Sequence, residues 1–345
     1  MIQGCIINSV SKLKITFSTS LAKLRFAICL IFLSLQLAAL AEAGNLGKIK
    51  IISAEKLDYQ DGNSTLIGNV KIQIGSFTIE APKAFIDADS NGESSYARFV
   101  GGVSLDSDRI SIVAPRMDID VNKSLLKSFS NNGDLVVTTI FSKKQANLYA
   151  QYQEINLATG FAQANSGNAE DVMQVKYVSE EMNINSDKLE LELQELSSIQ
   201  YINFLSNVTA ISDKLRVESQ DLVYFPSLDL VKANDDVRLL FLSETQQASY
   251  LFSDSALFEQ SKNLLSVFSR GPQRFAEIHS DQIFGKARQI LVNIDEDQNI
   301  DNAILTGNAY AQHQSKSLLG HEILLDIKNQ KLETTVGRPR TRILQ

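Results

Sequence analysis

The chain has few of the residues that build reactive or metal-binding sites. Its two cysteines, Cys5 and Cys29, both lie near the N-terminus, so the rest of the chain contains no thiol. This excludes disulfides and thiolate chemistry there. The three histidines are widely spaced and none neighbours a cysteine, so we predict no metal site. They are His279, His313 and His321.

Several other sequence features are also scarce or missing. Five prolines and 17 glycines are scattered along the chain without forming a Pro- or Gly-rich stretch, so no flexible linker marks a domain boundary. Basic residues form no run, and the formal net charge is −7, which excludes nucleic acid as an expected partner. The sequence contains no G-x-S-x-G motif, Walker loop or dinucleotide fingerprint. We therefore predict that the protein is not an enzyme and uses no cofactor.

The first 43 residues have the pattern of a secretory signal. Four basic residues precede an apolar run from Phe26 to Leu40, and Ala41-Glu42-Ala43 provides small residues where signal peptidase reads the chain. We expect a signal helix within residues 1–43, cleavage after Ala43 and export to the periplasm. The alternative is an uncleaved inner-membrane anchor, although the apolar run is shorter than the roughly 20 residues that span a bilayer.

A repeat of 29 to 39 residues runs through the remainder of the chain. Its mark is a Gly- or Asn-containing turn followed by a strand-like run. The marks are Gly68-Asn69-Val70, Gly101-Gly102-Val103, Asn132-Gly133-Asp134, Gly167-Asn168, Asn207-Val208, Asp235-Asp236-Val237, Gly271 and Gly307-Asn308-Ala309. They predict about eight two-strand units, and such units must stack because one alone cannot bury its apolar face.

Around the clearest marks, apolar and polar residues alternate with a period of two, which is typical of strands with one buried face. The alternation shifts by one residue at Pro82, which predicts a bulge, and the proline recurs in the next unit as Pro115. The region from Leu148 to Leu193 is the least regular. Within it, Lys188 to Leu196 fits a short amphipathic helix as well as a strand.

The inward positions of the first units form the candidate binding surface. Apolar side chains at every second position suit either an ordinary core or a groove for acyl chains. The residues that we assign to a lipid-binding inner face are Val70, Ile72, Ile79, Ile86, Val103, Ile112 and Ile119. Asp118 and Asp120 share the opposite face, so we expect them to contact water rather than to form a catalytic pair.

Two further sets of charged residues are expected to be solvated. The stretch from Asp295 to Asp301 has oxygen ligands at alternate positions, but Ile300 and Thr306 stand where a calcium loop needs Gly and Glu. It therefore predicts a turn. The basic residues of the first units are dispersed over the predicted outer face. They are Lys71, Lys83, Arg98, Arg109 and Arg116.

Segments at both ends of the repeat region resemble one known family. At the start they are Ile52 to Tyr59 and Leu66 to Val70, and at the end Ala303 to Ala309, Gly320 to Asp326 and Val336 to Pro339. They are similar to the OstA/LptA family of periplasmic lipopolysaccharide transport proteins. The resemblance covers roughly residues 50–130 and 280–344.

The resemblance implies an elongated, open, twisted β-jellyroll of stacked two-strand repeats. It also implies that the apolar interior shields lipopolysaccharide acyl chains during transport from the inner to the outer membrane, without catalysis. The implied partners are lipopolysaccharide or a related lipid, the inner- and outer-membrane transport complexes, and other OstA-fold proteins or a second copy, paired through edge strands.

For the domains, we expect one jellyroll unit over residues 44–165 and a second over residues 166–345, either separate from the first or continuous with it. Three alternatives for the function stay open. They are an inner-membrane-anchored relative in the same pathway, a structural envelope protein without lipid cargo, and a β-helix enzyme that acts on polysaccharide.

Overall fold

The structure is a computed structural model that describes residues 46–334 and 340–343, apart from residues 61, 90, 132, 142–144, 167–173, 181, 195–197, 243–247 and 272. The predicted signal over residues 1–43 lies outside this part of the chain. Residues Leu46–Gln345 form one compact unit. Its regular elements are β-strands and two short 3₁₀ helices. Lys188–Gln194 is a strand, so the alternative of a helix there is wrong.

The elements of the first half are β1 Lys50–Ser53, β2 Lys56–Gln60, β3 Asn63–Ile74, β4 Phe77–Ala88, β5 Ser94–Asp106, β6 Ile110–Asp120, β7 Leu125–Phe129, β8 Val136–Ile140, β9 Ala146–Ala150, β10 Tyr152–Asn156, β11 Phe161–Asn165, β12 Val175–Ser179 and β13 Asn183–Ser186. Those of the second half are β14 Lys188–Gln194, β15 Ser198–Ile211, β16 Leu215–Phe225, η1 Pro226–Leu228, β17 Leu230–Phe241, β18 Ser249–Glu259, η2 Gln260–Lys262, β19 Leu264–Phe268, β20 Ala276–Ser280, β21 Ile283–Ala287, β22 Gln289–Ile294, β23 Ile300–His313, β24 Lys316–Asp326, β25 Lys331–Thr334 and β26 Arg340–Ile343.

The long strands bend in the middle and belong to two layers at once. The first half of β3 pairs with β2 and its second half with β1. In the same way β6 pairs with β7 and β8, and β18 with β19 and β20. We call the layer of β2, β7, β10, β11, β14, β19, β22 and β25 layer A, and that of β1, β8, β9, β12, β13, β20, β21 and β26 layer B. Each long strand contributes one half to each layer.

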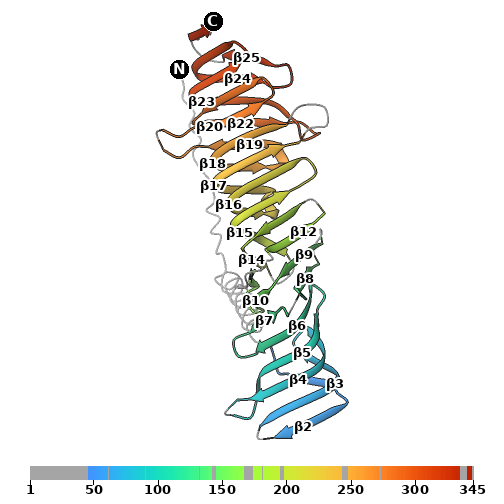
Figure 1. Ribbon diagram of the computed structural model, residues 1–345. Helices are drawn as coiled ribbons and strands as arrows, with labels where there is room; N and C mark the ends of the chain where they lie inside the picture. The colour runs from blue at the N-terminus through green and yellow to red at the C-terminus, as the bar shows by residue number, and fades with distance from the viewer. Residues whose placement is uncertain are drawn as a thin grey trace, which may run out of the picture. The chain divides into compact units, whose positions relative to one another are not determined.

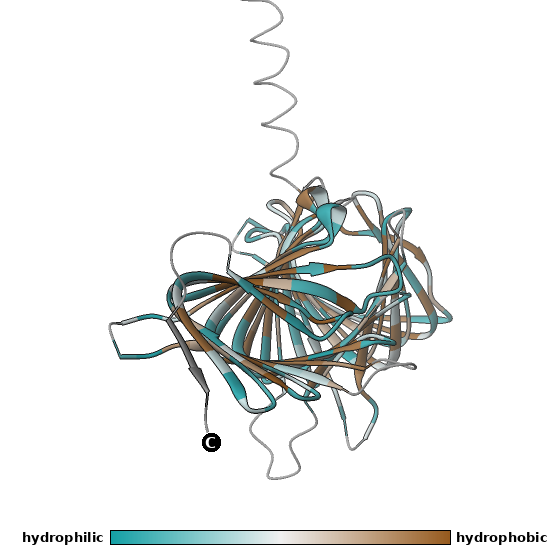
Figure 2. Ribbon diagram, turned by 90° about the horizontal axis from the view of Figure 1, so that it is seen from above, coloured by the Kyte–Doolittle hydropathy of each residue, from teal (hydrophilic) through white to brown (hydrophobic). Residues whose placement is uncertain are grey.

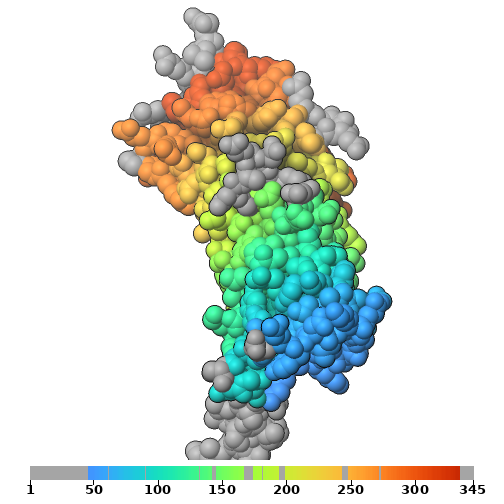
Figure 3. Space-filling model, turned by 60° about the horizontal axis from the view of Figure 1, so that its bottom comes forward, coloured from blue at the N-terminus to red at the C-terminus, as the bar shows by residue number. Residues whose placement is uncertain are grey.

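All pairings are antiparallel and join strands that are close in sequence. The strands therefore stack in chain order, as the labels from β2 to β25 show in Figure 1 and the sequence of colours shows in Figure 3. The predicted all-β fold of stacked two-strand repeats is confirmed. The division into units at residues 165 and 166 stays a prediction, and β11, which ends at Asn165, pairs with both β10 and β14.

Most of the repeat marks that the structure describes lie at the bends of the long strands. Gly68 and Asn69 have φ values of 76° and 45°, and the pairing of β3 with β4 shifts register there. Asp235 and Asp236 in β17 have φ values of 60° and 53° at a similar shift. Glycine, asparagine and aspartate adopt the left-handed region most easily, which explains why these residues mark the repeat. These marks, and those at Gly101, Asn207 and Gly307, are bends within strands, whereas Gly133 and Gly271 lie in the connections from β7 to β8 and from β19 to β20.

A second series of bends lies where the chain returns from layer B to layer A, and we call both series corners. Each corner of the second series has a small residue on its inner side. The series is Ala81, Ala114, Ala150, Ser186, Ser219, Ser253, Ala287 and Gly320, spaced by 33 to 36 residues. The register shift between Glu80 and Lys83 confirms the bulge predicted at Pro82. Proline is tolerated at such a bend because it need not donate a ladder hydrogen bond.

All these corners join the layers along one side of the stack, whereas on the other side each layer ends in its own turns. We call that second side the open edge. The core lies between the layers and is formed by every second residue, as the alternating colours along the ribbons in Figure 2 indicate. Leu66, Val70, Ile72 and Ile74 of β3 are each no more than 1% exposed. The alternation seen in the sequence is thus the alternation of core and surface.

Candidate lipid-binding interior

The seven residues predicted to form the inner face all point between the layers. Val70, Ile72, Ile79, Val103 and Ile112 lie in layer B, and Ile86 and Ile119 in layer A. Each of the seven is at most 3% exposed. They are packed against one another and line none of the cavity described below. Their role in lipid binding stays a prediction.

A polar bridge crosses the interior beyond these residues. The Thr138 hydroxyl in layer B donates a hydrogen bond to the Gln153 side-chain oxygen in layer A. The Gln153 amide lies 3.4 Å from the carbonyl oxygens of Val136 and Leu148, and both bridging side chains are buried. Ser128, which is in register with Gln153 on the neighbouring strand, is buried as well. The bridge lies within one continuous core, and we use it to distinguish an N-terminal from a C-terminal part of the interior.

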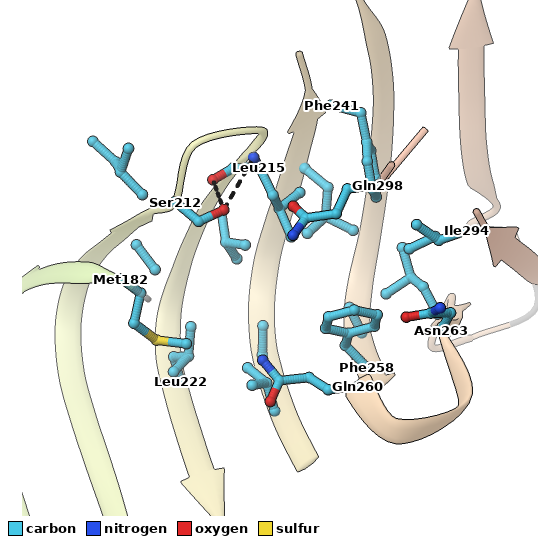
Figure 4. A pocket seen from close by; sticks show the side chains of 18 of the residues that line it. Met182, Ser212, Leu215, Leu222, Phe241, Phe258, Gln260, Asn263, Ile294 and Gln298 are labelled. Atoms are coloured by element: carbon cyan, nitrogen blue, oxygen red, sulfur yellow. Dashed lines mark hydrogen bonds between the residues drawn. The ribbon is translucent and has the colours of Figure 1, made fainter. Parts of the chain in front are cut away.

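The C-terminal part contains a cavity of about 600 Å³ between the two layers (Figure 4). Its layer B wall is formed by β15, β16 and β17, and its layer A wall by the other halves of β16 and β17 together with β18 and β19. Its walls are mostly apolar. The apolar lining residues are Met182, Ala210, Ile211, Leu215, Val217, Leu222, Val231, Ala233, Leu239, Phe241, Ala256, Phe258, Leu265 and Ile294. None of them belongs to the predicted inner-face set.

The cavity arises because small residues occupy inward positions that carry large residues elsewhere. In layer A, Ala233 pairs directly with Ala256, so two adjacent strands lack bulk at the same level. At the corresponding level of the N-terminal part, Phe99 pairs with Met117, and both are fully buried. Alanines at inward positions, such as Ala233 and Ala256, are the signal for this cavity that the sequence contains. Only the strand pairing shows that they lie side by side.

The cavity reaches the surface at the open edge. Met182, Leu215 and Phe258 are only partly buried there, and Ile211 is 40% exposed. Turns of both layers surround this mouth. They are Glu180, Met182 and residues 211–215 of layer B, and residues 226–230, 259–263 and 294–299 of layer A. The cavity is therefore accessible from the side of the stack.

One hydrogen bond connects the two layers across the mouth. The Lys214 Nζ atom, in the turn between β15 and β16, donates to the backbone oxygen of Asp297 at 2.8 Å. Asp297 lies in the turn between β22 and β23. In that turn the Asn299 N–H donates to Asp295 Oδ1 at 2.8 Å, so the turn predicted for this acidic stretch is confirmed.

Asp118 differs from the sequence expectation. It lies on the outer face as predicted, but it is only 6% exposed because Arg98 and Arg116 from neighbouring positions cover it. Burial alone would raise the pKa of Asp118, but hydrogen bonds from Arg116 and Tyr96 and the charges of both guanidinium groups lower it below its usual value. The Arg116 guanidinium also lies 4.4 Å from the centroid of the Phe129 ring. This cluster is an ion-pair network, and not a pair of solvated carboxylates.

The histidines do not gather into a site. His279 lies between the rings of Phe252 and Phe284 and 3.3 Å from Glu277 on the outer face. In the part of the chain that the structure describes, no three potential metal-ligating side chains come together. Within the same residues, no helix has the length and apolar character needed to cross a bilayer.

No family model matches the chain, and no curated protein does. Among solved structures, the chain is similar to the crystal structure of LptH, described as the LptA homologous periplasmic component of the conserved lipopolysaccharide transport device from Pseudomonas aeruginosa. The identity is 13%, the TM-score is 0.21, and the match covers 45% of this chain and 82% of LptH. A likeness of this extent carries no argument about function, which has to rest on the geometry.

Proposed function

We propose that the protein is an exported, non-enzymatic scaffold that holds lipid acyl chains between its two layers and shields them from water. The observation that carries this proposal is the apolar cavity of about 600 Å³ that reaches the surface at the open edge. Each methylene group that moves from water into such a site gains about 0.8 kcal/mol, so part of one acyl chain is enough for measurable binding.

The open edge gives the lipid a route in. An acyl chain enters sideways between the turns of the two layers, while its head group stays in water at the mouth. The seven packed inner-face residues from Val70 to Ile119 take a smaller part in this proposal, because the layers must separate before a chain can reach them. Lipopolysaccharide is the cargo that the sequence resemblance names, and it is one of the lipids to test.

The N-terminal end of the stack supports a second part of the proposal, which is pairing with another copy or with another protein of this fold. Strands β1 and β2 are edge strands whose residues are all exposed. Leu57 is 58% exposed and Tyr59 is 71% exposed. An unpaired edge with exposed apolar residues favours the addition of a strand from a partner.

Site-specific photocrosslinking in cells tests the lipid proposal. Photoreactive residues replace Leu222 or Ala256 in the cavity, Val103 or Ile112 in the packed part, and Asn69 at an outer bend. We expect lipid adducts from the cavity positions and few or none from Asn69. Adducts from Asn69 alone would contradict the proposal, and so would native mass spectra of envelope-purified protein that carry no lipid.

Export has a separate test. We propose that residues 1–43 are removed and that the mature protein lies in the periplasm. N-terminal sequencing of protein purified from the envelope is expected to begin at Gly44. A sequence that begins at Met1 in a membrane fraction would instead support the anchored alternative.

A further inference from the structure

The mouth of the cavity carries acidic side chains from both layers. Glu180 and Asp213 of layer B and Asp229 of layer A line the opening, and all three are exposed. The turn between β22 and β23 adds Asp295, Glu296 and Asp297 beside the lining residue Gln298. A head group held at this mouth is therefore close to several carboxylates.

Two lysines, Lys214 and Lys262, lie in the part of these turns that the structure describes. Lys214 Nζ donates to the Asp297 backbone oxygen at 2.8 Å, and Lys262 forms an ion pair with Glu259. The remaining polar lining residues near the opening are uncharged, and Gln260, Asn263 and Gln298 offer amide donors and acceptors. Figure 4 shows these three side chains around the cavity. Lys214 keeps its charge, because a backbone oxygen does not neutralise an ammonium group, but the carboxylates of these turns outnumber the two lysines, so the mouth is negative overall.

From this charge distribution we infer that the cavity selects acyl lipids whose head group has no net negative charge. This inference rests on the proposed lipid binding and specifies the class of lipid. A phosphate at the mouth is repelled by the surrounding carboxylates over distances shorter than the Debye length, which is about 10 Å at 0.1 M salt. A zwitterionic or uncharged head group avoids this repulsion and accepts the amide hydrogen bonds.

Lipid extraction from mixed vesicles tests the inference. The purified full chain is incubated with vesicles of equal parts phosphatidylethanolamine and phosphatidylglycerol with identical acyl chains. The bound lipid is then measured by mass spectrometry. At low salt, repulsion by about three rim carboxylates predicts roughly a tenfold preference for phosphatidylethanolamine, and the preference should shrink as the salt concentration rises.

The chain contains a matched control for the charge at the mouth. Asp213 lies in a turn in which the Ser212 hydroxyl accepts a hydrogen bond from the Leu215 N–H and donates one to the Leu215 carbonyl oxygen. Asp108 lies in the same kind of turn, with Ser107 and Ile110 in these roles, and it does not line the cavity. Asp213→Lys should lower the preference for phosphatidylethanolamine severalfold, and Asp108→Lys should leave it unchanged.

The outcomes separate the two proposals. Preferential extraction of phosphatidylethanolamine, weakened by Asp213→Lys alone, supports the inference. Equal or preferential extraction of phosphatidylglycerol overturns it while lipid binding stands. An equal effect of Asp108→Lys also overturns it, because the preference would then arise from net charge. Extraction of neither lipid contradicts the proposed function itself.

Discussion

Filling the cavity should stabilise the protein and weaken its lipid binding at the same time. Ala233 pairs with Ala256 at the cavity wall, so the substitution Ala233→Leu places three additional carbon atoms in open space. Their burial gains about 0.8 kcal/mol each, and ordering the leucine costs about 0.5 to 1 kcal/mol. The expected result is a gain of about 1.5 kcal/mol in the free energy of unfolding.

The same leucine occupies the volume of about three lipid methylene groups. If those groups lose their burial, binding weakens by about 2.4 kcal/mol, which is roughly 50-fold. Chemical denaturation measures the stability, with the midpoint compared at constant m-value. Native mass spectrometry or titration with a lipid measures the binding.

A matched substitution makes the result specific. Ala97 is an inward alanine of layer A in the packed N-terminal part, and it is 0% exposed. Ala97→Leu should overfill that region and destabilise the protein by about 1 to 3 kcal/mol, with lipid binding in the C-terminal part retained. If Ala233→Leu destabilises the protein as much as Ala97→Leu does, the interior at Ala233 has no room for a hydrocarbon chain.

Three further predictions concern stability and assembly. Asp118→Asn should lower stability by about 1 to 2 kcal/mol at pH 7. The pKa of Asp118 is lowered from 3.8 in the folded protein, so the ionised carboxylate contributes its full stabilisation above about pH 4 and loses it as the pH falls through the folded-state pKa. The stabilities of the wild-type protein and of Asp118→Asn should therefore converge in acid denaturation. Thr138→Val should lower the free energy of unfolding by about 1 to 3 kcal/mol, because the Gln153 side-chain oxygen loses its hydrogen-bond donor. Thr138→Val combined with Gln153→Leu should be nearly neutral. If the single and the double variant lose the same stability, the hydrogen bond between the two side chains does not contribute. Tyr59→Pro in edge strand β2 should reduce self-association, because proline blocks the addition of a further strand. Analytical ultracentrifugation measures the association, and an unchanged association would rule out pairing through this edge.

The periodic features of the fold were predictable from sequence, because they depend on local rules. The alternation around Val70, the bulge at Pro82 and the paired left-handed residues such as Gly68 and Asn69 each follow from backbone geometry within a few residues. The irregular middle hid the repeat because its corners use serine and alanine, such as Ala150 and Ser186, in place of the Ala-Pro pair.

The candidate site was not predictable in the same way. The cavity depends on Ala233 pairing with Ala256, and on both layers presenting small residues at one level, which only the register reveals. The burial of Asp118 likewise depends on arginines from an adjacent strand and from two residues along its own strand. The alternation in the sequence indicates which face a residue occupies, but it does not identify the cross-strand neighbours that decide its burial and its charge environment.

The polar bridge between Thr138 and Gln153 has a consequence for the kinetics of transfer. A hydrocarbon tail that slid lengthwise between Thr138 and Gln153 would break this buried hydrogen bond and leave amide and hydroxyl groups unpaired, at about 1 to 3 kcal/mol for each group. The bridge therefore disfavours lengthwise movement along this line, by roughly a factor of ten for each 1.4 kcal/mol of lost bonding. If a lipid occupies the C-terminal cavity as we propose, its most favourable way out is the lateral opening, and that opening rather than the length of the stack sets its residence time.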